Sequence, residues 1–401
     1  MNVIFLTISR FSDITARGIY PDLLRKFARE GHNVYIVSPR ERRFGLPTEL
    51  IHQELGTILG VRTLNLQKTN VIEKGFGTIL MESQFKAAIK KYLKGIKWDL
   101  ILYSTPPITF PRVIKYLKHK NPSARTYLLL KDIFPQNAVD LGMFSKKSLV
   151  YCLFRRKEKQ LYRMSNHIGC MSPANVQFIC KHNPEISPER VEVAPNSIEL
   201  VPMSSVSLKD KKSIRKKYGI PEDGPVFIYG GNLGKPQGID YLIKCLDANA
   251  CRKDCFFLVI GTGTELPRLK QWYQDTRPTS VKVMEGIPKN EYDVLVRSCD
   301  VGLIFLDHRF TIPNYPSRLL PYLENRMPVL CATDSNTDIG KIAVENGYGV
   351  WCESNSVDEF TAALQNMLAS DFAEMGENGY RFLCENYLVD NTYSTIMAHY
   401  V

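Results

Sequence analysis

A glycine-rich segment in the second half of the chain combines a permissive backbone with amide and ammonium side chains. Residues 230–238 read Gly-Gly-Asn-Leu-Gly-Lys-Pro-Gln-Gly, between a predicted strand and a predicted helix. Glycines let the backbone approach a diphosphate and a helix N-terminus favours its negative charge, while Lys235 adds a cation beside Asn232 and Gln237. The segment is neither a P-loop nor a GxGxxG motif, so it indicates neither ATP nor NAD chemistry. A tight strand-to-helix turn explains the glycines equally well.

Two further predicted strands of this half also end in glycine turns. One leads into Gly261 and Gly263, and the other leads into Gly286 and Ile287. Two such turns can wall a flat nucleobase, with backbone N–H and C=O groups reading its edge. Ordinary turns are the alternative interpretation.

The most unusual stretch is 312–324, Ile-Pro-Asn-Tyr-Pro-Ser-Arg-Leu-Leu-Pro-Tyr-Leu-Glu. Its proline-rich loop ends at Ser317 and Arg318 and leads into a short predicted helix. A hydroxyl, a fixed cation and free amide donors at a helix start can bind phosphate or sugar hydroxyls.

A charged pair, Lys131 and Asp132, follows the predicted strand 125–130. In a parallel α/β sheet, the carboxyl ends of strands are where ligands bind, so Asp132 could bind a sugar hydroxyl or act as a base. It could instead cap the next helix.

A basic helix is predicted over 148–164, with Leu149, Leu153 and Tyr162 along one face. A basic amphipathic helix can lie on anionic lipid, whereas a packed helix with a solvated face is the alternative. The candidate membrane or acceptor contacts on this helix are Arg155, Arg156, Lys157 and Lys159.

Composition excludes several classes of protein. The seven histidines form no HExxH or HxH cluster and GxSxG is absent, which disfavours metal catalysis and a serine hydrolase. The ten cysteines are scattered without a CxxC pair, as in a reduced cytosolic protein. No apolar run approaches the roughly 18 residues of a membrane-spanning helix, and the N-terminus reads as a strand rather than a signal peptide. We therefore expect a cytoplasmic protein.

The positive charge is concentrated in the first half of the chain. Residues 1–200 contain 31 Lys+Arg and 16 Asp+Glu, a net charge of +15, whereas residues 201–401 contain 21 and 25, a net charge of −4. This asymmetry favours an anionic partner such as nucleic acid, acidic lipid or a phosphorylated substrate. Surface charge that serves solubility alone is the alternative interpretation. Nucleic acid is disfavoured, because the basic residues are dispersed among helices without aromatic interleaving.

The elements that must position these residues form two similar series. Residues 3–37 read strand, polar loop, amphipathic helix and strand, the opening of a doubly wound sheet. The series restarts at 226–229, after a linker placed near 198–206. We predict an α/β fold with two Rossmann-like domains, residues 1–200 and 201–386, facing each other across a cleft.

The ordered motifs resemble those of retaining glycosyltransferases of family four, which have the GT-B fold. More narrowly, Gly-Asn-x-Gly-x-x-Gln-Gly at 231–238 and Pro-Ser-Arg at 316–318 resemble O-antigen and capsule transferases of the N-acetyl-L-fucosamine transferase type. Further matching landmarks are Gly18 with the segment 29–34, the segments 98–101 and 131–135, and Pro195 with Asn196. The resemblance also implies that a helix near 387–401 returns to the first domain.

The resemblance assigns roles to the candidate residues. Asn232, Lys235 and Gln237 would lie near the donor diphosphate, and Ser317 and Arg318 near phosphate or ribose. The glycine turns, Gly261 to Gly263 and Gly286 with Ile287, would lie near the base. In the first domain, which would bind the acceptor, Gly18 would let a loop close on the donor and Asp132 would face the donor or acceptor sugar. No bound metal or other cofactor is expected, because cationic side chains and helix dipoles would stabilise the leaving diphosphate.

One departure from the family concerns its two glutamates eight residues apart. Pro313 and Pro321 occupy those positions here, and Glu324 falls three residues late. Ribose binding would then need Arg318, backbone donors or a shifted Glu324.

Together with these residues, the resemblance implies transfer of a sugar from a nucleoside-diphosphate donor, with UDP as the expected nucleotide, to a lipid-diphosphate-linked saccharide, with retention, at the inner face of a membrane. Asp132, Lys235 and Arg318 are the predicted catalytic residues. A nucleotide-sugar 2-epimerase shares the expected fold and is the alternative enzyme. Such an enzyme needs acidic and histidine residues around the sugar, and the second half of the sequence shows no strong cluster of that kind. A non-catalytic nucleotide-binding partner of a polysaccharide assembly complex is the alternative from another class.

Overall fold

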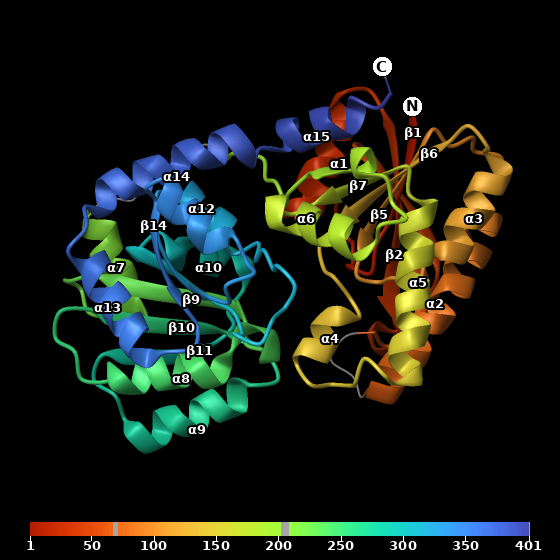
Figure 1. Ribbon diagram of the computed structural model, residues 1–401. Coiled ribbons are helices and arrows are strands. Elements are labelled where there is room, and N and C mark those ends of the chain that lie inside the picture. The colour runs from red at the N-terminus through yellow and green to blue at the C-terminus, as the bar shows by residue number, and fades with distance from the viewer. Residues whose placement is uncertain (67–70, 202–207, 401) are drawn as a thin grey trace. The chain divides into compact units, whose positions relative to one another are not determined.

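The structure is a computed structural model that describes residues 1–66, 71–201 and 208–400. It contains two compact units (Figure 1): Met1–Glu199 with the segment that begins at Leu388, and Leu200–Tyr387. Residues 202–206 of the expected linker lie outside the described ranges. No helix within those ranges is long and apolar enough to cross a membrane.

The first unit is built on an eight-stranded sheet in the order β3-β4-β2-β1-β5-β6-β7-β8. Every pairing is parallel except β3 with β4, an antiparallel pair that the sequence patterns did not predict. The strands are β1 (Asn2–Leu6), β2 (Asn33–Glu41), β3 (Glu49–Gln53), β4 (Gly56–Thr63), β5 (Leu100–Thr105), β6 (Arg125–Leu130), β7 (His167–Cys170) and β8 (Val191–Val193). The helices are α1 (Ile19–Arg29), α2 (Val71–Tyr92), α3 (Pro111–Lys120), α4 (Gln136–Asp140), α5 (Leu149–Met164), α6 (Pro173–His182) and α15 (Val389–Met397).

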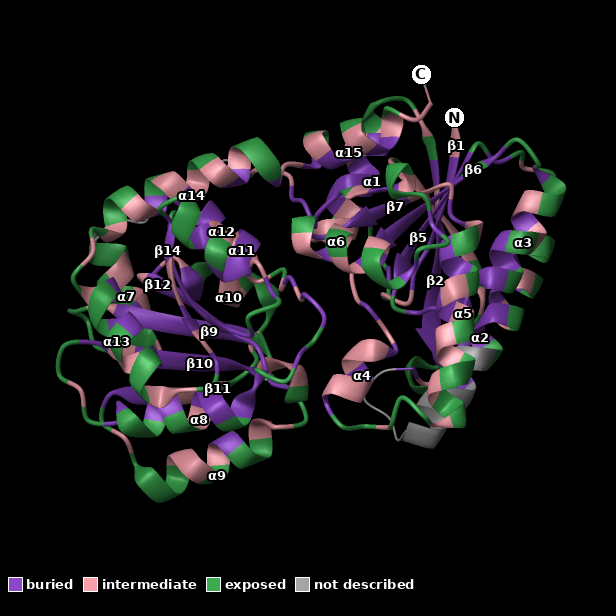
Figure 2. Cartoon of the chain, viewed as in Figure 1, coloured by how far each residue is buried: buried purple, intermediate pink, exposed green. Residues whose placement is uncertain are grey.

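Apolar periodicity explains these elements. The central strands β1 and β5 are buried along almost their whole length (Figure 2), as continuous apolar runs between two helical layers should be. Helix α1 buries Leu23, Leu24 and Phe27 at helical spacing and is followed by Gly31, which takes the left-handed conformation at φ +79°.

The C-terminal helix α15 belongs to the first unit and packs on α1. The ring of Tyr393 meets Phe27 edge to face, with 4.9 Å between centroids, and Lys26 pairs with Asp390 at 2.7 Å. Ile198 and Leu388 form a parallel bridge where the chain returns.

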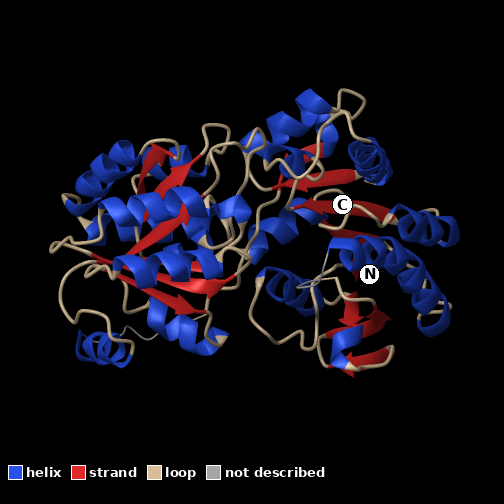
Figure 3. Cartoon of the chain, turned by 90° about the horizontal axis from the view of Figure 1, so that it is seen from below, coloured by secondary structure: helices blue, strands red, loops and turns tan. Residues whose placement is uncertain are grey.

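The second unit has a fully parallel six-stranded sheet in the order β11-β10-β9-β12-β13-β14. Helices lie on both faces of each sheet (Figure 3), which is the doubly wound arrangement predicted from the sequence. The strands are β9 (Val226–Asn232), β10 (Phe256–Thr262), β11 (Val281–Glu285), β12 (Val301–Phe305), β13 (Val329–Thr333) and β14 (Gly349–Glu353). The helices are α7 (Leu208–Lys217), α8 (Ile239–Ala248), α9 (Leu266–Thr276), α10 (Lys289–Val296), α11 (Leu319–Glu324), α12 (Ile339–Glu345), α13 (Val357–Leu368) and α14 (Phe372–Asn386).

Two strands of the second unit run further than predicted. Strand β9 continues through Asn232 and β10 through Thr262, where the sequence predicted loops, and Gly261 pairs in register with Gly231. The first part of the glycine-rich segment is therefore sheet, and its loop is confined to residues 233–238.

Candidate functional site

The loop after β9 carries three of the predicted donor residues. Asn232 donates a hydrogen bond from its side-chain amide to Oε1 of Gln237 at 3.0 Å, and Lys235 is exposed. Pro236 accepts a hydrogen bond at 3.1 Å from the backbone N–H of Asp307, directly after β12. The loop is thus fixed at the carboxyl edge of the sheet, where the exposed Lys235 ammonium is available to an anion.

Two of the predicted base-binding glycines are required by packing. A Cβ atom on Gly261 would lie 1.8 Å from the carbonyl oxygen of Gly231, and one on Gly263 would lie 2.2 Å from that of Leu233. The chain just after β9 is also hydrogen-bonded to the end of β10, because the N–H of Leu233 donates to the carbonyl oxygen of Thr262 at 2.9 Å. The close approach of β9 and β10 therefore accounts for both glycines without a ligand.

The other predicted base contacts lie at the end of β11. Gly286 is exposed beside the methyl group of Thr262, and Ile287 is half-buried. Both remain placed at the carboxyl edge of the sheet, as the sequence predicted.

We expect Gly261→Ala to lower the free energy of unfolding by at least about 3 kcal/mol, because the added Cβ forces two backbones apart. Gly18→Ala is the matched control. Gly18 has an extended backbone, and a Cβ there would meet nothing closer than Pro21 at 3.6 Å. Urea unfolding should separate the two variants; equal stabilities would contradict the packing account.

Arg318 lies in a cluster of aromatic side chains from three elements. Its guanidinium carbon is 4.3 Å from the ring centroid of Tyr229 in β9. Tyr229 in turn donates to the carbonyl oxygen of Asn232 at 2.9 Å, which links Arg318 to the start of the loop 233–238. Within the described residues, Nη1 of Arg318 is buried and has no hydrogen-bond partner. A buried guanidinium nitrogen in this state calls for an anionic or carbonyl acceptor.

Two further tyrosines hold this cluster together. The hydroxyl of Tyr322 in α11 donates to Ile228 and accepts from the N–H of Gly230, both at 3.1 Å. Tyr292 in α10 lies against Gly230, where a Cβ atom would meet its hydroxyl at 1.8 Å. Burial raises the pKa of Tyr229, so the ring that stacks on Arg318 is neutral. The sequence motifs did not identify these tyrosines as neighbours of Arg318.

Neighbouring loops position the proline-rich segment that precedes Arg318. The N–H of Asn314 donates to Oγ1 of Thr337 at 3.0 Å, and that hydroxyl donates to Asp334 at 2.8 Å. Burial raises the pKa of Asp334 to about 6. Ser317 is exposed next to Arg318, as expected for a ligand contact.

Glu324 lies away from the N-terminal end of α11, where Arg318 is found. It is the last residue of α11, at the opposite end of the helix from Arg318, and it is buried. Burial raises the pKa of Tyr380 in α14, and the charge of Glu324 contributes to that shift, which places the carboxylate on the α14 side. The expectation that a shifted Glu324 serves the donor gains no support from this position.

In the first unit, Gly18 begins α1, and its N–H donates to Asp22 at 3.0 Å. Arg25 binds the same carboxylate at 2.6 Å and the carbonyl oxygens of Ile14 and Ala16, so the loop before Gly18 is anchored. Neither the backbone nor the packing requires glycine at position 18, which favours its predicted role in close approach to a ligand.

Asp132 is half-buried after β6 and accepts a hydrogen bond from the side-chain amide of Asn137 at 2.8 Å. The N-cap of α4 is Pro135, not Asp132. Its neighbour Lys131 donates to the carbonyl oxygen of Ala194 at 2.9 Å, and burial lowers the pKa of Lys131 to about 7.

Lys131 should therefore make stability depend on pH. Because its folded-state pKa lies below its unfolded value, the unfolded chain binds more protons above pH 7, and stability rises with pH. We expect Lys131→Met to remove about 1 kcal/mol per pH unit from the slope between pH 7 and 9. Chemical denaturation at several pH values measures this slope; exposed Lys115→Met is the control that should keep it, and an unchanged slope in Lys131→Met would contradict the burial of this charge.

Most of the basic side chains predicted to face a membrane are paired within the first unit. Arg155 binds Glu158 at 2.5 Å and Asn183 at 2.7 Å. The ammonium of Lys157 lies 4.0 Å from Glu82, and that of Lys159 lies 3.1 Å from Glu185. Of the four, Arg156 is exposed. Three of the four predicted membrane or acceptor contacts are therefore ion-paired within the first unit, and their predicted role stays a prediction.

Helix α5 instead exposes apolar side chains at its start. Leu149 is 88% exposed and Leu153 is 52% exposed, whereas Tyr162, expected on the same face, is buried. Met143, Val150 and the preceding Lys146 and Lys147 are exposed as well. We call Met143, Lys146, Lys147, Leu149, Val150, Leu153 and Arg156 the α5 patch.

Comparison with known proteins relates the second unit to a family of enzymes. The sequence profile of Glycosyl transferases group 1 matches residues 210–382. The second unit carries a glycosyltransferase group 1 domain. The match includes the loop 233–238, the glycine turns and Arg318, while Gly18, Asp132 and the α5 patch lie outside it.

Similar proteins extend over the whole chain. "Probable glycosyltransferase WbjE" of Pseudomonas aeruginosa is 23% identical over 336 residues, 80% of this chain and 78% of its own. The fold resembles that of WaaG, a glycosyltransferase involved in lipopolysaccharide biosynthesis, with a TM-score of 0.65, 14% identity and 98% and 99% of the two chains covered. It also resembles Anabaena Alr3699/HepE in complex with UDP and glucose, with a TM-score of 0.69, 14% identity and 100% and 99% coverage. The predicted class, two Rossmann-like units as in GT-B glycosyltransferases, is confirmed.

Proposed function

We propose that this glycosyltransferase transfers a sugar, an N-acetylated or deoxy hexose, from a UDP-linked donor to a lipid-diphosphate-linked saccharide in capsule or O-antigen biosynthesis. The observation that carries the proposal is the buried Nη1 of Arg318, which has no hydrogen-bond partner among the described residues and lies near the loop 233–238. The names of HepE, bound to UDP and glucose, and of WaaG, involved in lipopolysaccharide biosynthesis, support the donor and the pathway class.

The second unit would bind the donor through its diphosphate. Arg318 would donate charge-assisted hydrogen bonds to phosphate oxygens, and the exposed Lys235 would approach from the loop. Negative charge grows on the leaving diphosphate as the bond to the sugar breaks, so fixed cations stabilise the transition state more than the ground state. We expect this arrangement to work without a bound metal.

Retention would follow from a front-face reaction. The bond between the anomeric carbon and the phosphate oxygen breaks, the acceptor oxygen bonds to the same face, and the acceptor proton passes to the departing phosphate. Asp132, held by Asn137, would orient a hydroxyl group of the donor or acceptor sugar. Arg318 and Lys235 then serve the leaving group, and Gly18 leaves room for the donor.

The lipid-linked acceptor would be reached at an anionic membrane, through the α5 patch. Its apolar side chains are solvent-exposed, which is costly in water and favourable in a lipid interface. Lys146, Lys147 and Arg156 surround them with positive charge that suits anionic lipid headgroups. The protein would thus act as a peripheral enzyme on the cytoplasmic face.

A thermal-shift screen against UDP, GDP, dTDP, CDP and ADP tests the donor class. A ligand that binds the native state alone raises stability by RT ln(1 + [L]/Kd), about 2.7 kcal/mol at 100 times Kd. We expect UDP to raise the melting temperature and the other nucleotides to have little effect. Stabilisation by another nucleoside diphosphate would replace UDP in the proposal, and no shift with any of them would contradict a preformed donor site.

A further inference from the structure

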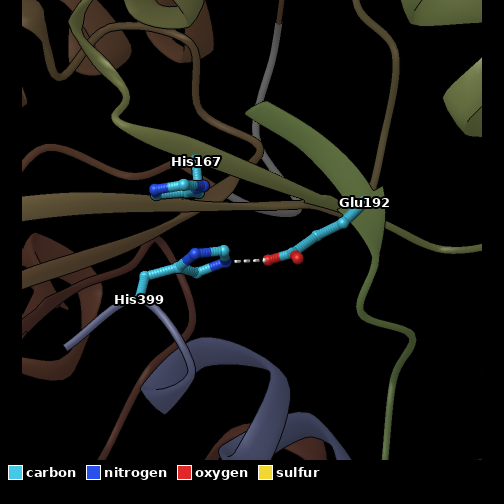
Figure 4. Close-up of side chains that lie close together, drawn as sticks. All are labelled: His167, Glu192 and His399. Carbon is cyan, nitrogen blue, oxygen red and sulfur yellow. Dashed lines mark hydrogen bonds and ion pairs between the residues drawn. The ribbon is translucent and has the colours of Figure 1, made fainter. Parts of the chain in front are cut away.

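Two histidines and a glutamate meet in the first unit, away from the residues discussed above. His167 is the first residue of β7, Glu192 lies in β8, and His399 follows α15. Figure 4 shows the two imidazole rings stacked, with the Glu192 carboxylate reaching His399. The ring centroids are 3.5 Å apart with 15° between their planes, and Nε2 of His399 lies 2.9 Å from Oε1 of Glu192.

We propose that His167, Glu192 and His399 bind a zinc ion. Each offers one ligand atom, and these atoms all lie within 4.8 Å of one another. Two imidazole nitrogens and one carboxylate oxygen form a donor set that zinc prefers, and a water molecule completes the tetrahedron. Bonds of about 2.0–2.1 Å place tetrahedral donors about 3.4 Å apart. A metal lies in the plane of each imidazole that binds it, so the two stacked rings would turn out of their stack to share one ion.

A second layer of contacts orients these ligands. The buried Tyr127 donates from its hydroxyl to Oε1 of Glu192 at 2.7 Å, and its ring lies 6.3–6.4 Å from both imidazoles. Such outer partners fix ligand orientation in metal sites. Among the described residues, Nδ1 of His167 is buried and has no hydrogen-bond partner, so one ring nitrogen in the cluster is unsatisfied.

The charges around the cluster indicate which kind of metal ion it suits. A metal binds the neutral form of an imidazole through one ring nitrogen. The positive charges of Arg125 and Arg190 near His167 oppose a further cation, whereas the Glu192 carboxylate favours it. The set therefore suits a strongly bound transition metal better than magnesium, which takes oxygen ligands.

The position of the cluster gives the metal a structural role. His167 pairs in register with Tyr127 near the start of β6, whereas Asp132 follows the carboxyl end of that strand. The metal would join the C-terminal segment, through His399, to strands β7 and β8. It would fasten α15 to the first unit and take no part in sugar transfer.

Isothermal titration of the full chain with zinc chloride tests the inference. We expect one zinc per chain, no response to magnesium, and a loss of affinity of more than about 100-fold in His399→Ala and in His167→Ala, beyond the 10- to 100-fold effect of outer partners. Tyr127→Phe should weaken binding about tenfold by releasing Glu192. The matched control His119→Ala removes an exposed histidine outside the cluster and should bind zinc as the wild type does.

Circular dichroism and the zinc-dependent rise in melting temperature, which should vanish in His399→Ala, guard against a folding defect. His399 lies in the short segment after the last helix, so its replacement should leave the fold intact. Failure of the wild type to bind zinc, or equal affinities in His399→Ala and His119→Ala, would overturn the inference.

Discussion

Replacement of Arg318 by methionine is expected to weaken UDP binding by about 10- to 100-fold. Hydrogen bonds to charged groups contribute about 1.5–3 kcal/mol each, and Arg318 offers the buried nitrogen that has no partner among the described residues. Methionine keeps apolar contact with the ring of Tyr229, so the variant removes the charge and the donors more than the packing. Titration calorimetry with UDP measures the change.

The chain offers a matched control for this variant. Arg326 also stacks on a tyrosine, with its guanidinium carbon 3.9 Å from the Tyr380 centroid, and it pairs with Glu377 beyond the other end of α11. Arg326→Met removes a stacked arginine from the same unit and should leave UDP affinity unchanged. Arg318→Lys should retain part of the affinity, because the charge remains and the planar fork is lost. Wild-type affinity in Arg318→Met would remove this residue from the donor site.

The second large effect concerns membrane binding. The double variant Leu149→Asp with Leu153→Asp is expected to reduce partitioning to vesicles rich in phosphatidylglycerol by at least about 30-fold. Burying a leucine side chain contributes about 1.5–3 kcal/mol, and the added carboxylates repel anionic headgroups. Both side chains are already exposed, at 88% and 52%, so the fold should be retained. Vesicle sedimentation measures the bound fraction.

Two controls separate the α5 patch from general charge effects. Val344→Asp changes an apolar residue of α12 that is also 52% exposed and should leave sedimentation unchanged. Arg156→Glu should weaken binding modestly, by the roughly 1 kcal/mol that one basic residue near the surface contributes. If the double leucine variant sediments with anionic vesicles as the wild type does, the α5 patch is not the docking surface.

Local sequence patterns were sufficient for the fold, and they led to the candidate residues at one edge of the second sheet. Continuous apolar runs such as β1 and β12 can only be buried strands, and their alternation with amphipathic helices led to the two doubly wound units. Glycine turns and Arg318 were found because these residue types have distinct backbone or charge properties. Their common edge of the sheet follows from the parallel strand order.

What the sequence could not reveal depends on contacts between distant segments. Tyr229, Tyr292 and Tyr322 are far apart in sequence, and each looks like an ordinary core residue until the sheet brings them around Arg318. The partners of Lys157 and Lys159 come from α2 and from the segment after α6, so the same charge pattern on α5 could equally have left these two cations free. A usable signal was present in Gly302 inside β12, where a Cβ would lie 2.2 Å from the Tyr322 ring.

We propose above all that the chain transfers a sugar from a UDP-linked donor to a lipid-linked acceptor with retention. The most direct measurement is UDP release from a set of UDP-sugars, with and without lipid-diphosphate-linked saccharides in phosphatidylglycerol vesicles, followed by proton NMR of the glycosylated product. We predict acceptor-dependent release from one donor, a product with the anomeric configuration of the donor, and at least about 100-fold less release in Arg318→Met. An inverted product would contradict the front-face mechanism, and UDP binding without release in any acceptor mixture would contradict the transferase itself.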